Sequence, residues 1–357
     1  MIDFFTLPDP QIAQLTKPAL CSFSNAEADW NQLSKLWSWS HFKEYWIIPD
    51  FDLFGSPSDN RMKKGFQDTQ KRPILLLQGS NETRHATKSI AVLGISEGEM
   101  AELPVNTFKA AIYAGEVQLG IWSNIRDPLV VEALGDSGFD FVTIDCEHAP
   151  NDLGDVVTAL QVLRGTPAQA AVRVPSLDPA ALKRVLDAGA QTVIVPYIQT
   201  VEEAELAAAA VAYPPHGFRG VAGGVRAAGF GAIEDYYTKA RDEICLVLQI
   251  ETQLGLDNLE AIAAVDGVDA LFVGPSDLSA SLGYPQQMTE EPMQNAIRDA
   301  IERIAATGKP AGFLATSDLL LQIAKDAGAK MIVPAIDMTS LRLAVGDNLA
   351  AHSHLKN

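Results

Sequence analysis

The sequence predicts an α/β fold, a (β/α)8 TIM barrel over residues 100–357, preceded by an unassigned N-terminal extension over residues 1–99. Three observations favour the barrel. Short runs rich in β-branched and apolar residues recur eight times, a helical pattern follows each run, and the length of the region suits eight such units. A doubly wound parallel sheet is the alternative that the same alternation allows.

The expected strands are continuous apolar runs, which is typical of parallel strands buried on both faces. A short lead, residues 101–116, first predicts a helix. In chain order the eight runs are LGIWS, FVTIDCE, AAVRVP, TVIVPYI, CLVLQIE, ALFVGPS, AGFLA and MIVPAID. We therefore expect eight strands of similar length, all buried in the barrel wall.

Helical spacing of apolar residues characterises the segments that follow these runs. They are DPLVVEALGDSG, NDLGDVVTALQVLRG, DPAALKRVLDAGA, TVEEAELAAAAVA, LGLDNLEAIAAVDG, TEEPMQNAIRDAIERIAATG, SDLLLQIAKDAGA and a last helix in TSLRLAVGDNLAAH. Asp, Thr or Ser opens several of them and Gly closes most, as expected for helix starts and stops. One helix is thus expected after each strand.

The first hundred residues differ in composition from the rest. Four of the five tryptophans and the polar stretch GSPSDNRMKKGFQDTQKR fall there. Strands are predicted at YWIIPDF and PILLLQG, and an amphipathic helix around AEADWNQLSKLW, but no chemical motif is present. Two interpretations stay open: a small packed or partner-binding domain, and a poorly ordered extension or artefact of upstream translation, with Met100 as the true start.

Charge and composition exclude several classes of protein. A formal net charge of −18 argues against nucleic acid or an anionic membrane as a partner. The start, MIDFFTLPDP, lacks the features of a signal peptide, and the apolar stretch AELAAAAVA is too short to span a bilayer. The three cysteines are far apart, without a disulfide framework or a CxxC metal spacing. These features predict a cytoplasmic protein that binds small molecules.

Two acids stand where an apolar run stops, Glu251 in LVLQIET and Asp277 in ALFVGPSD, about one strand, helix, strand unit apart. Neighbouring parallel strands place both at one rim, where Mg²⁺ or Mn²⁺ can take two oxygens and keep positions for water and substrate. The alternative is that each acid begins a loop or caps a helix. Further polar residues are expected at the same rim: Asp145, Glu147, His148, Arg173 and Gln249.

The connection YPPHGFRGVAGGVRAAGFGAIEDYY is longer than a helix-to-strand loop needs and is rich in Gly. Its length and composition predict a mobile lid over the rim. Arg219 and Arg226 within it are expected either to meet an anionic substrate or to pair with surface acids.

In order and spacing, IDCEHAPND, AVRVP, LVLQIET and FVGPSDLS, with NTFKAAI, LKRVLDAGAQTVIVP and YPPHGFRGV, resemble the HpcH/HpaI class II aldolases of the phosphoenolpyruvate/pyruvate superfamily. The resemblance covers nearly the whole barrel and leaves out the first hundred residues. It implies a carbon–carbon lyase that cleaves 4-hydroxy-2-oxo acids reversibly to pyruvate and an aldehyde. The implied substrates are 4-hydroxy-2-oxoheptane-1,7-dioate, met in aromatic compound catabolism, and 2-dehydro-3-deoxy sugar acids.

The resemblance also implies roles for single residues. Glu251 and Asp277 match the ligands of a divalent metal, Mg²⁺ or Mn²⁺ with Co²⁺ as a further option. Arg173 matches the arginine that stabilises the enolate, where fixed positive charge is most useful. His148 matches the general base, and its near-neutral reference pKa suits that task.

Three more residues match the family's substrate-binding and positioning residues. Gln249 and Ser276 match positions that bind the oxo acid together with Asp277, and Asp187 matches an acid that raises the basicity of the histidine. Asp187 ends the third helix and should face away from its own rim, so the pairing would need a neighbouring subunit. A structural role at the helix end is the alternative. Because the family commonly forms trimers or pairs of trimers, a homo-oligomer is expected.

Two departures from the family pattern affect the site. Cys146 stands where the family commonly has Gly, which is expected to narrow the pocket. VPAIDMTS replaces the VGVDTS type, with Asp337 at the matching place, which is expected to alter the accepted aldehyde. Two other functions remain as alternatives: a lyase of the superfamily acting on an acyl-CoA ester or phosphoenolpyruvate, and a noncatalytic oxo-acid-binding barrel.

Overall fold

The computed structural model describes residues 20–23, 73–77, 88–94 and 101–356. The chain divides into two compact units, Met1–Met100 and Ala101–Asn357. The first contains an antiparallel sheet in the order β1-β3-β2, formed by β1 (Leu20–Phe23), β2 (Pro73–Leu77) and β3 (Lys88–Gly94). β2 lies within the predicted strand PILLLQG, and β1 and β3 were not predicted. The predicted strand YWIIPDF and helix AEADWNQLSKLW lie outside the described residues.

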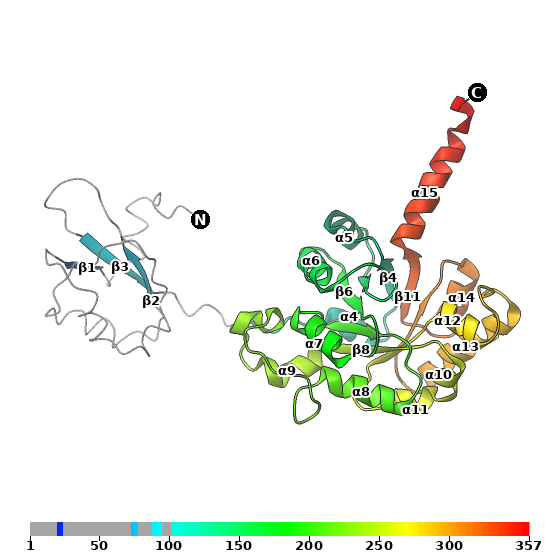
Figure 1. Ribbon diagram of the computed structural model, residues 1–357, viewed down its shortest axis with the longest axis horizontal. Helices are drawn as coiled ribbons and strands as arrows, with labels where there is room; N and C mark the ends of the chain where they lie inside the picture. Colours follow the sequence, from blue (N-terminus) through cyan, green and yellow to red (C-terminus); the bar gives the residue numbers. More distant parts are fainter. Residues whose placement is uncertain (1–19, 24–72, 78–87, 95–100, 357) are drawn as a thin grey trace. The chain divides into compact units, whose positions relative to one another are not determined.

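The second unit is a closed barrel of eight parallel strands, which confirms the predicted (β/α)8 fold (Figure 1). Neighbouring strands follow each other in chain order, and β11 closes the barrel on β4 with a register shift between Ile332 and Ala335. The strands are β4 (Gln118–Ser123), β5 (Phe141–Asp145), β6 (Gln169–Arg173), β7 (Thr192–Val195), β8 (Cys245–Ile250), β9 (Ala270–Val273), β10 (Ala311–Leu314) and β11 (Met331–Ile336).

Helices lie before and between these strands. They are α4 (Thr107–Tyr113), α5 (Pro128–Gly135), α6 (Leu153–Leu163), α7 (Pro179–Asp187), α8 (Val201–Val211), α9 (Tyr236–Glu243), α10 (Gln253–Asp257), α11 (Leu259–Ala263), α12 (Pro275–Ser281), α13 (Glu291–Ala306), α14 (Asp318–Asp326) and α15 (Asp337–Ala351), with 3-10 turns η3 (Arg226–Gly231) and η4 (Ser353–Lys356). α9 and α12 were not predicted, and the helix expected over residues 254–267 is divided at Asn258. No helix in the described part of the chain is long and apolar enough to cross a membrane.

Sequence signals explain where the helices begin. The side chains of Asp127 and Asp178 accept hydrogen bonds from the first turns of α5 and α7, each followed by Pro at the first helical position. Asp152 and Thr200 form capping boxes at the starts of α6 and α8. Each cap begins a helix soon after a strand has ended. Because the strands are parallel, their carboxyl ends lie on one rim of the barrel.

Large and small side chains alternate inside the barrel. A Cβ at Gly120 would lie 2.3 Å from the Phe141 ring, and one at Gly312 would lie 2.3 Å from the Phe272 ring, so glycine makes room for both aromatic rings. α4 closes the amino-terminal end, with the Phe108 ring centroid 4.8 Å from that of Phe141. The interior is therefore a packed core, and open space is left to the strand ends.

The last helix does not pack as a barrel helix should. Figure 1 shows α15 projecting away from the barrel, and Asp337 is its buried residue. The Asp337 carboxylate accepts hydrogen bonds from the backbone of Asn124 and Ile125, at 3.0 and 2.9 Å, and so ties the start of α15 to the loop after β4. The helix predicted in TSLRLAVGDNLAAH thus forms, and it projects from the barrel.

The tight packing at Gly120 generates a stability prediction. Gly120→Ala should lower the free energy of unfolding by about 1–3 kcal/mol, because the added methyl group must displace the Phe141 ring from a filled interior. Gly165→Ala is the matched control, since its Cβ would meet only the Val162 carbonyl oxygen, at 3.5 Å. Thermal and urea unfolding of the two variants measure the difference, and equal stabilities would contradict this packing.

Candidate active site

The carboxyl ends of two pairs of neighbouring strands, β5 with β6 and β8 with β9, carry the polar residues of the rim. In a parallel barrel these ends face the same side, so residues distant in sequence meet there. The charge of Asp277 contributes to raising the pKa of both Glu147 and Glu251, so the three carboxylates are within electrostatic reach of one another. Of the predicted site residues, the rim brings together Arg173, Glu251, Gln249, Asp277, Ser276 and His148.

Arg173 and Asp145 form a buried bidentate pair. They are register partners on β6 and β5, and Arg173 donates from Nε and Nη2 to the two Asp145 oxygens at 2.8 and 2.7 Å. Burial alone would raise the pKa of Asp145, but its hydrogen bonds and the Arg173 charge outweigh burial and hold that pKa below its usual value. The pair therefore fixes a charged guanidinium plane at the rim.

Two further side chains orient the Arg173 guanidinium. Its Nη1 lies 2.8 Å from Glu147 Oε2, and its central carbon lies 4.9 Å from the centre of the Trp122 ring. Burial raises the pKa of Glu147, while the Arg173 charge opposes that shift. A carboxylate, an aromatic face and the Asp145 pair thus hold the guanidinium from three sides.

His148 lies on the loop after β5, which Asp145 organises. The Asp145 Oδ1 accepts hydrogen bonds from the backbone N–H groups of Glu147 and His148, at 3.0 and 3.5 Å. The His148 side chain is 62% exposed, with Nε2 3.6 Å from Glu147 Oε1, so a substrate or a second subunit can reach it. Burial raises the pKa of neighbouring Cys146 to about 12, which leaves it a neutral thiol and no nucleophile.

Glu251 follows β8 and is almost fully buried. One oxygen accepts a hydrogen bond from the Tyr197 backbone N–H at 2.7 Å, and the other accepts from Gln249 Nε2 at 3.1 Å. Burial, assisted by the charges of Glu147 and Asp277, raises the pKa of Glu251 to about 7. Tyr197 reaches this position in a left-handed conformation with φ 61°, a strained geometry that often marks a functional site.

The Glu251 carboxylate packs directly against the backbone of Gly274. A Cβ at this position would lie 2.2 Å from Glu251 Oε2 and 3.2 Å from Gln249 Nε2. Any larger residue would therefore displace the carboxylate. Three residues further on, in the first turn of α12, Asp277 is exposed, and the Ser276 hydroxyl reaches only the Met288 sulfur at 3.8 Å.

The donor set at this rim fits a divalent cation. Burial raises the pKa of Glu147 and of Glu251; the charge of Asp277 adds to both shifts and the charge of Glu147 adds to that of Glu251, a repulsion that a cation would relieve. The Gln249 amide oxygen is buried and accepts no hydrogen bond from the described residues. Within residues 101–356 no group of three or more His, Cys, Asp or Glu is arranged to hold a metal ion. Two carboxylates with water and substrate oxygens are a common set for Mg²⁺.

Asp187 lies away from this rim, as its helical position predicts. It is the last residue of α7, shortly before β7 begins, and therefore sits at the amino-terminal face of the barrel. Its Oδ1 accepts a hydrogen bond from Arg219 Nη2 at 2.6 Å. A pairing of Asp187 with His148 of the same subunit is excluded by this placement.

The prediction that the connection from α8 to β8 forms a lid over the rim of its own subunit is wrong. The connection from α8 to β8 begins and ends at the amino-terminal face, because a helix-to-strand loop returns to where the next strand starts. Arg219 pairs with Asp187, and Arg226 donates to the carbonyl oxygens of Ala188 and Leu160 at 2.7 and 3.4 Å. These arginines were expected to meet an anionic substrate or to pair with acids. Arg219 pairs with an acid, whereas Arg226 donates hydrogen bonds to backbone carbonyl groups.

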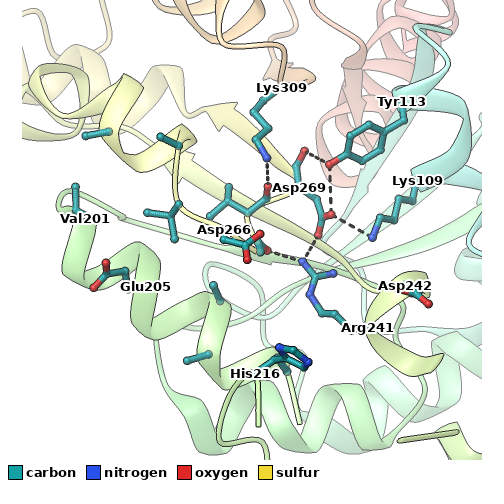
Figure 2. A pocket seen from close by; sticks show the side chains of 18 residues that line it. Lys109, Tyr113, Val201, Glu205, His216, Arg241, Asp242, Asp266, Asp269 and Lys309 are labelled. Carbon is teal, nitrogen blue, oxygen red and sulfur yellow. Dashed lines mark hydrogen bonds and ion pairs between the residues drawn. The ribbon is translucent and has the colours of Figure 1, made fainter. Parts of the chain in front are cut away.

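A cavity of about 890 Å³ lies at the amino-terminal face and contains none of the predicted site residues. Figure 2 shows Lys109, Tyr113 and Arg241 converging on Asp269. Lys109 Nζ and Arg241 Nη2 lie 3.1 and 2.9 Å from the Asp269 carboxylate, and Lys309 donates to the Val268 carbonyl at 2.7 Å. Because these cations already have partners in the protein, we assign the candidate active site to the rim and not to this cavity.

Sequence reasoning missed three contributors to the rim. Trp122 stacks on Arg173, Gly274 lets its backbone lie against the Glu251 carboxylate, and the Tyr197 backbone N–H holds the same carboxylate. Trp122 and Gly274 both stand at strand ends, a position that could have singled them out. The left-handed Tyr197 left no signal, because its residue type does not favour that conformation.

Comparison with known proteins agrees with this geometry. The sequence profile of the HpcH/HpaI aldolase/citrate lyase family matches residues 118–341, and the chain belongs to that family. It is similar to a hydroxypyruvate/pyruvate aldolase of Sagittula stellata, 44% identical over 68% of this chain and 96% of the relative. It is also similar to a 5-keto-4-deoxy-D-glucarate aldolase of Escherichia coli, 42% identical over 67% and 93%. The protein is therefore an enzyme of the carbon–carbon lyase class.

A solved structure gives the same result. The chain is similar to an HpcH/HpaI aldolase/citrate lyase family protein from Burkholderia cenocepacia, with a TM-score of 0.67 and 35% identity. The match covers 71% of this chain and all of that one. Family and fold thus agree with the resemblance in the sequence, and the first hundred residues lie outside the family match.

The close packing of Gly274 against Glu251 generates a prediction about metal binding. Gly274→Ala should weaken Mn²⁺ binding by at least about tenfold, because its methyl group would displace the Glu251 carboxylate. Water-proton relaxation measures Mn²⁺ binding without any substrate. Gly224→Ala is the matched control, since a Cβ there meets nothing within 4 Å. Unchanged Mn²⁺ binding by a folded Gly274→Ala variant would contradict a role for the Glu251 carboxylate in holding the metal.

Proposed function

We propose that the protein is a divalent-metal-dependent aldolase that cleaves 4-hydroxy-2-oxo acids reversibly to pyruvate and an aldehyde. The observation that carries this proposal is the Arg173 guanidinium, held by Asp145 and Glu147 on the same rim as Glu251 and Asp277. Aldol cleavage leaves negative charge on the keto oxygen, which calls for fixed positive charge at that point. Membership of an aldolase family supports the same reaction class.

Glu251 and Asp277 would hold the metal, with Mg²⁺ or Mn²⁺ as the first candidates and Co²⁺ as a third. When bound, such a cation polarises the carbonyl of the oxo acid and lowers the energy of the enolate. Three contacts hold the Glu251 carboxylate in place. The Tyr197 N–H and the Gln249 amide donate hydrogen bonds to it, and the Gly274 backbone packs against it.

In the cleavage direction, a base removes the proton from the 4-hydroxyl group. The C3–C4 bond then breaks, its electron pair becomes the enolate of pyruvate, the aldehyde leaves, and C3 finally takes a proton. His148 is the proposed base because its exposed side chain stands beside the Arg173 and Glu147 pair. Arg173 would stabilise the enolate oxygen, and its rigid support means that little reorganisation is required.

The substrate class is proposed from the relatives. The named aldolases act on hydroxypyruvate or pyruvate and on 5-keto-4-deoxy-D-glucarate. A 2-oxo acid end could be held by Gln249 and by the backbone around Ser276, while the aldehyde end would extend toward the loops of the rim. Sugar-acid substrates of the second kind are therefore our first choice, with tartronate semialdehyde as the aldehyde.

A homo-oligomer, trimeric or hexameric, is part of the proposal. Met338, Leu341, Val345 and Leu349 follow helical spacing on α15 and are 50–59% exposed, which is unusual for one helix of a soluble barrel. A second copy of the chain is the proposed cover for this stripe. The placement of Asp187 away from its own rim supports the same assembly, because only a neighbouring copy could bring it to His148.

Charge placed on the α15 stripe tests the assembly. Leu341→Glu/Leu349→Glu should lower the mass measured by light scattering to that of a smaller species, because two carboxylates would be buried at the contact. Leu355→Glu is the control, since Leu355 is exposed but lies beyond α15. An unchanged mass in the double variant would remove α15 from the interface.

The reaction itself is tested by a cleavage assay. Wild-type protein with Mg²⁺ or Mn²⁺ should release pyruvate from 5-keto-4-deoxy-D-glucarate, followed by coupling to NADH oxidation, and EDTA should stop the release. Arg173→Lys should lower kcat by about 10²–10³-fold, because a lysine cannot keep the bidentate pair and the Glu147 contact together. Release at an equal rate in Arg173→Lys and wild type would contradict the role of the guanidinium.

A further inference from the structure

Arg219 is a buried cation with few partners. Its side chain is 0% exposed, and its hydrogen bonds come from one nitrogen, Nη2, to Asp187 at 2.6 Å and to the Tyr236 hydroxyl at 3.5 Å. Its Nε and Nη1 have no hydrogen-bond partner among the described residues. Burying a guanidinium costs several kcal/mol unless it is well paired, and an apolar side chain of similar size is often as stable. Stability alone therefore does not explain this residue.

Aromatic rings hold the guanidinium in one position. Its central carbon lies 4.5 Å from the centre of the Tyr213 ring and 6.0 Å from that of Tyr236. Tyr213, Tyr236 and Tyr237 pack edge to face, with ring centroids 5.2–6.2 Å apart. Cation–π contact and this packing fix Arg219 without satisfying its remaining donors.

Asp187 and Arg219, which form an ion pair, differ sharply in the exposure of their side chains. The Asp187 side chain is 21% exposed, whereas Arg219 is wholly enclosed. Oδ1 of Asp187 accepts from Arg219, and Oδ2 accepts no hydrogen bond from the described residues. The arginine cannot reach a ligand itself, so its effect passes through a carboxylate that has one oxygen free at the surface.

The end of α7 is fixed from a second side. Arg226, from the same connection, donates to the Ala188 carbonyl at 2.7 Å, and Gly189 follows with φ 102°. A Cβ at Gly189 would lie 2.7 Å from Arg226 Nη1. Arg219 thus holds the side chain of Asp187, and Arg226 holds the backbone of the next residue, Ala188. A variant of Arg226 is therefore a matched control for variants of Arg219.

We propose that Arg219 is a positioning residue, which with Tyr213 and Tyr236 sets the rotamer of Asp187 so that its free oxygen meets His148 of a second copy. This inference rests on the proposed function and on the oligomer. A carboxylate beside the histidine favours its protonated form and strengthens it as the base for the 4-hydroxyl proton. A carboxylate free to rotate would lose that effect while the subunit remained folded.

Comparing two reactions distinguishes the contribution of the base from that of the other residues of the site. Cleavage of 5-keto-4-deoxy-D-glucarate requires a hydroxyl proton to be removed. Decarboxylation of oxaloacetate does not, because the bond from C3 to the carboxylate carbon breaks, its electrons form the same enolate, CO₂ leaves, and C3 takes a proton from water. A defect in positioning Asp187 should therefore appear in the first reaction and spare the second.

The variants are Arg219→Met, Arg219→Lys, Asp187→Asn, the double variant Arg219→Met/Asp187→Asn, and the control Arg226→Met. Arg219→Met should lower kcat for cleavage by about tenfold or more, with oxaloacetate decarboxylation within about twofold of wild type and the oligomer intact. The double variant should be no slower than Asp187→Asn, because Arg219 acts through that carboxylate. Arg219→Lys should recover most of the cleavage rate, and Arg226→Met should keep the wild-type ratio of the two reactions.

The inference is overturned if Arg219→Met cleaves the substrate at the wild-type rate. It is also overturned if this variant loses both activities and its oligomeric state, which is the result expected for a purely structural role of Arg219. Additive losses in the double variant would also overturn it. If wild-type protein catalysed neither reaction with metal present, the proposed function would fail first, an outcome clearly distinct from a selective failure of Arg219.

Discussion

The site depends on the buried pair between Asp145 and Arg173. Their strands are neighbours in register, so the two side chains meet at the rim without help from a loop. The same carboxylate also accepts from the backbone of Glu147 and His148, and the guanidinium contacts Glu147 and Trp122. Removing the Arg173 charge would leave Asp145 buried and unpaired, a cost of about 3–5 kcal/mol. One interaction therefore supports both the proposed enolate-stabilising group and the loop of the proposed base.

Crowded carboxylates form the other half of the site. Glu251 is buried with its pKa raised to about 7, and the charges of Glu147 and Asp277 contribute to that shift. The cation that we propose for this site would relieve the repulsion between these charges. Glycine at position 274 lets its backbone lie against the Glu251 carboxylate, at the price of backbone freedom in the unfolded chain. Charged groups therefore dominate the rim, whereas apolar packing dominates the barrel below it.

Much of this arrangement could be predicted from the sequence, and the part that could not has physical reasons. Buried strands and capped helices have strong local patterns, so the barrel and the strand-end positions of Arg173 and Glu251 were found. The helix α15 was predicted, but its projection from the barrel was not, because a helical pattern does not specify what the helix packs against. The lid was misplaced because length and glycine content do not specify a face. The contact of Arg219 with Asp187 joins distant segments and carries no local signal.

We propose that this rim makes an enolate of pyruvate with a bound metal. Proton NMR in D₂O can follow the loss of the pyruvate methyl signal without any choice of aldehyde. We expect exchange with Mg²⁺ or Mn²⁺, none with EDTA, and none in Glu251→Gln. Absence of exchange in folded, metal-loaded wild-type protein, or exchange that persists in Glu251→Gln, would contradict it.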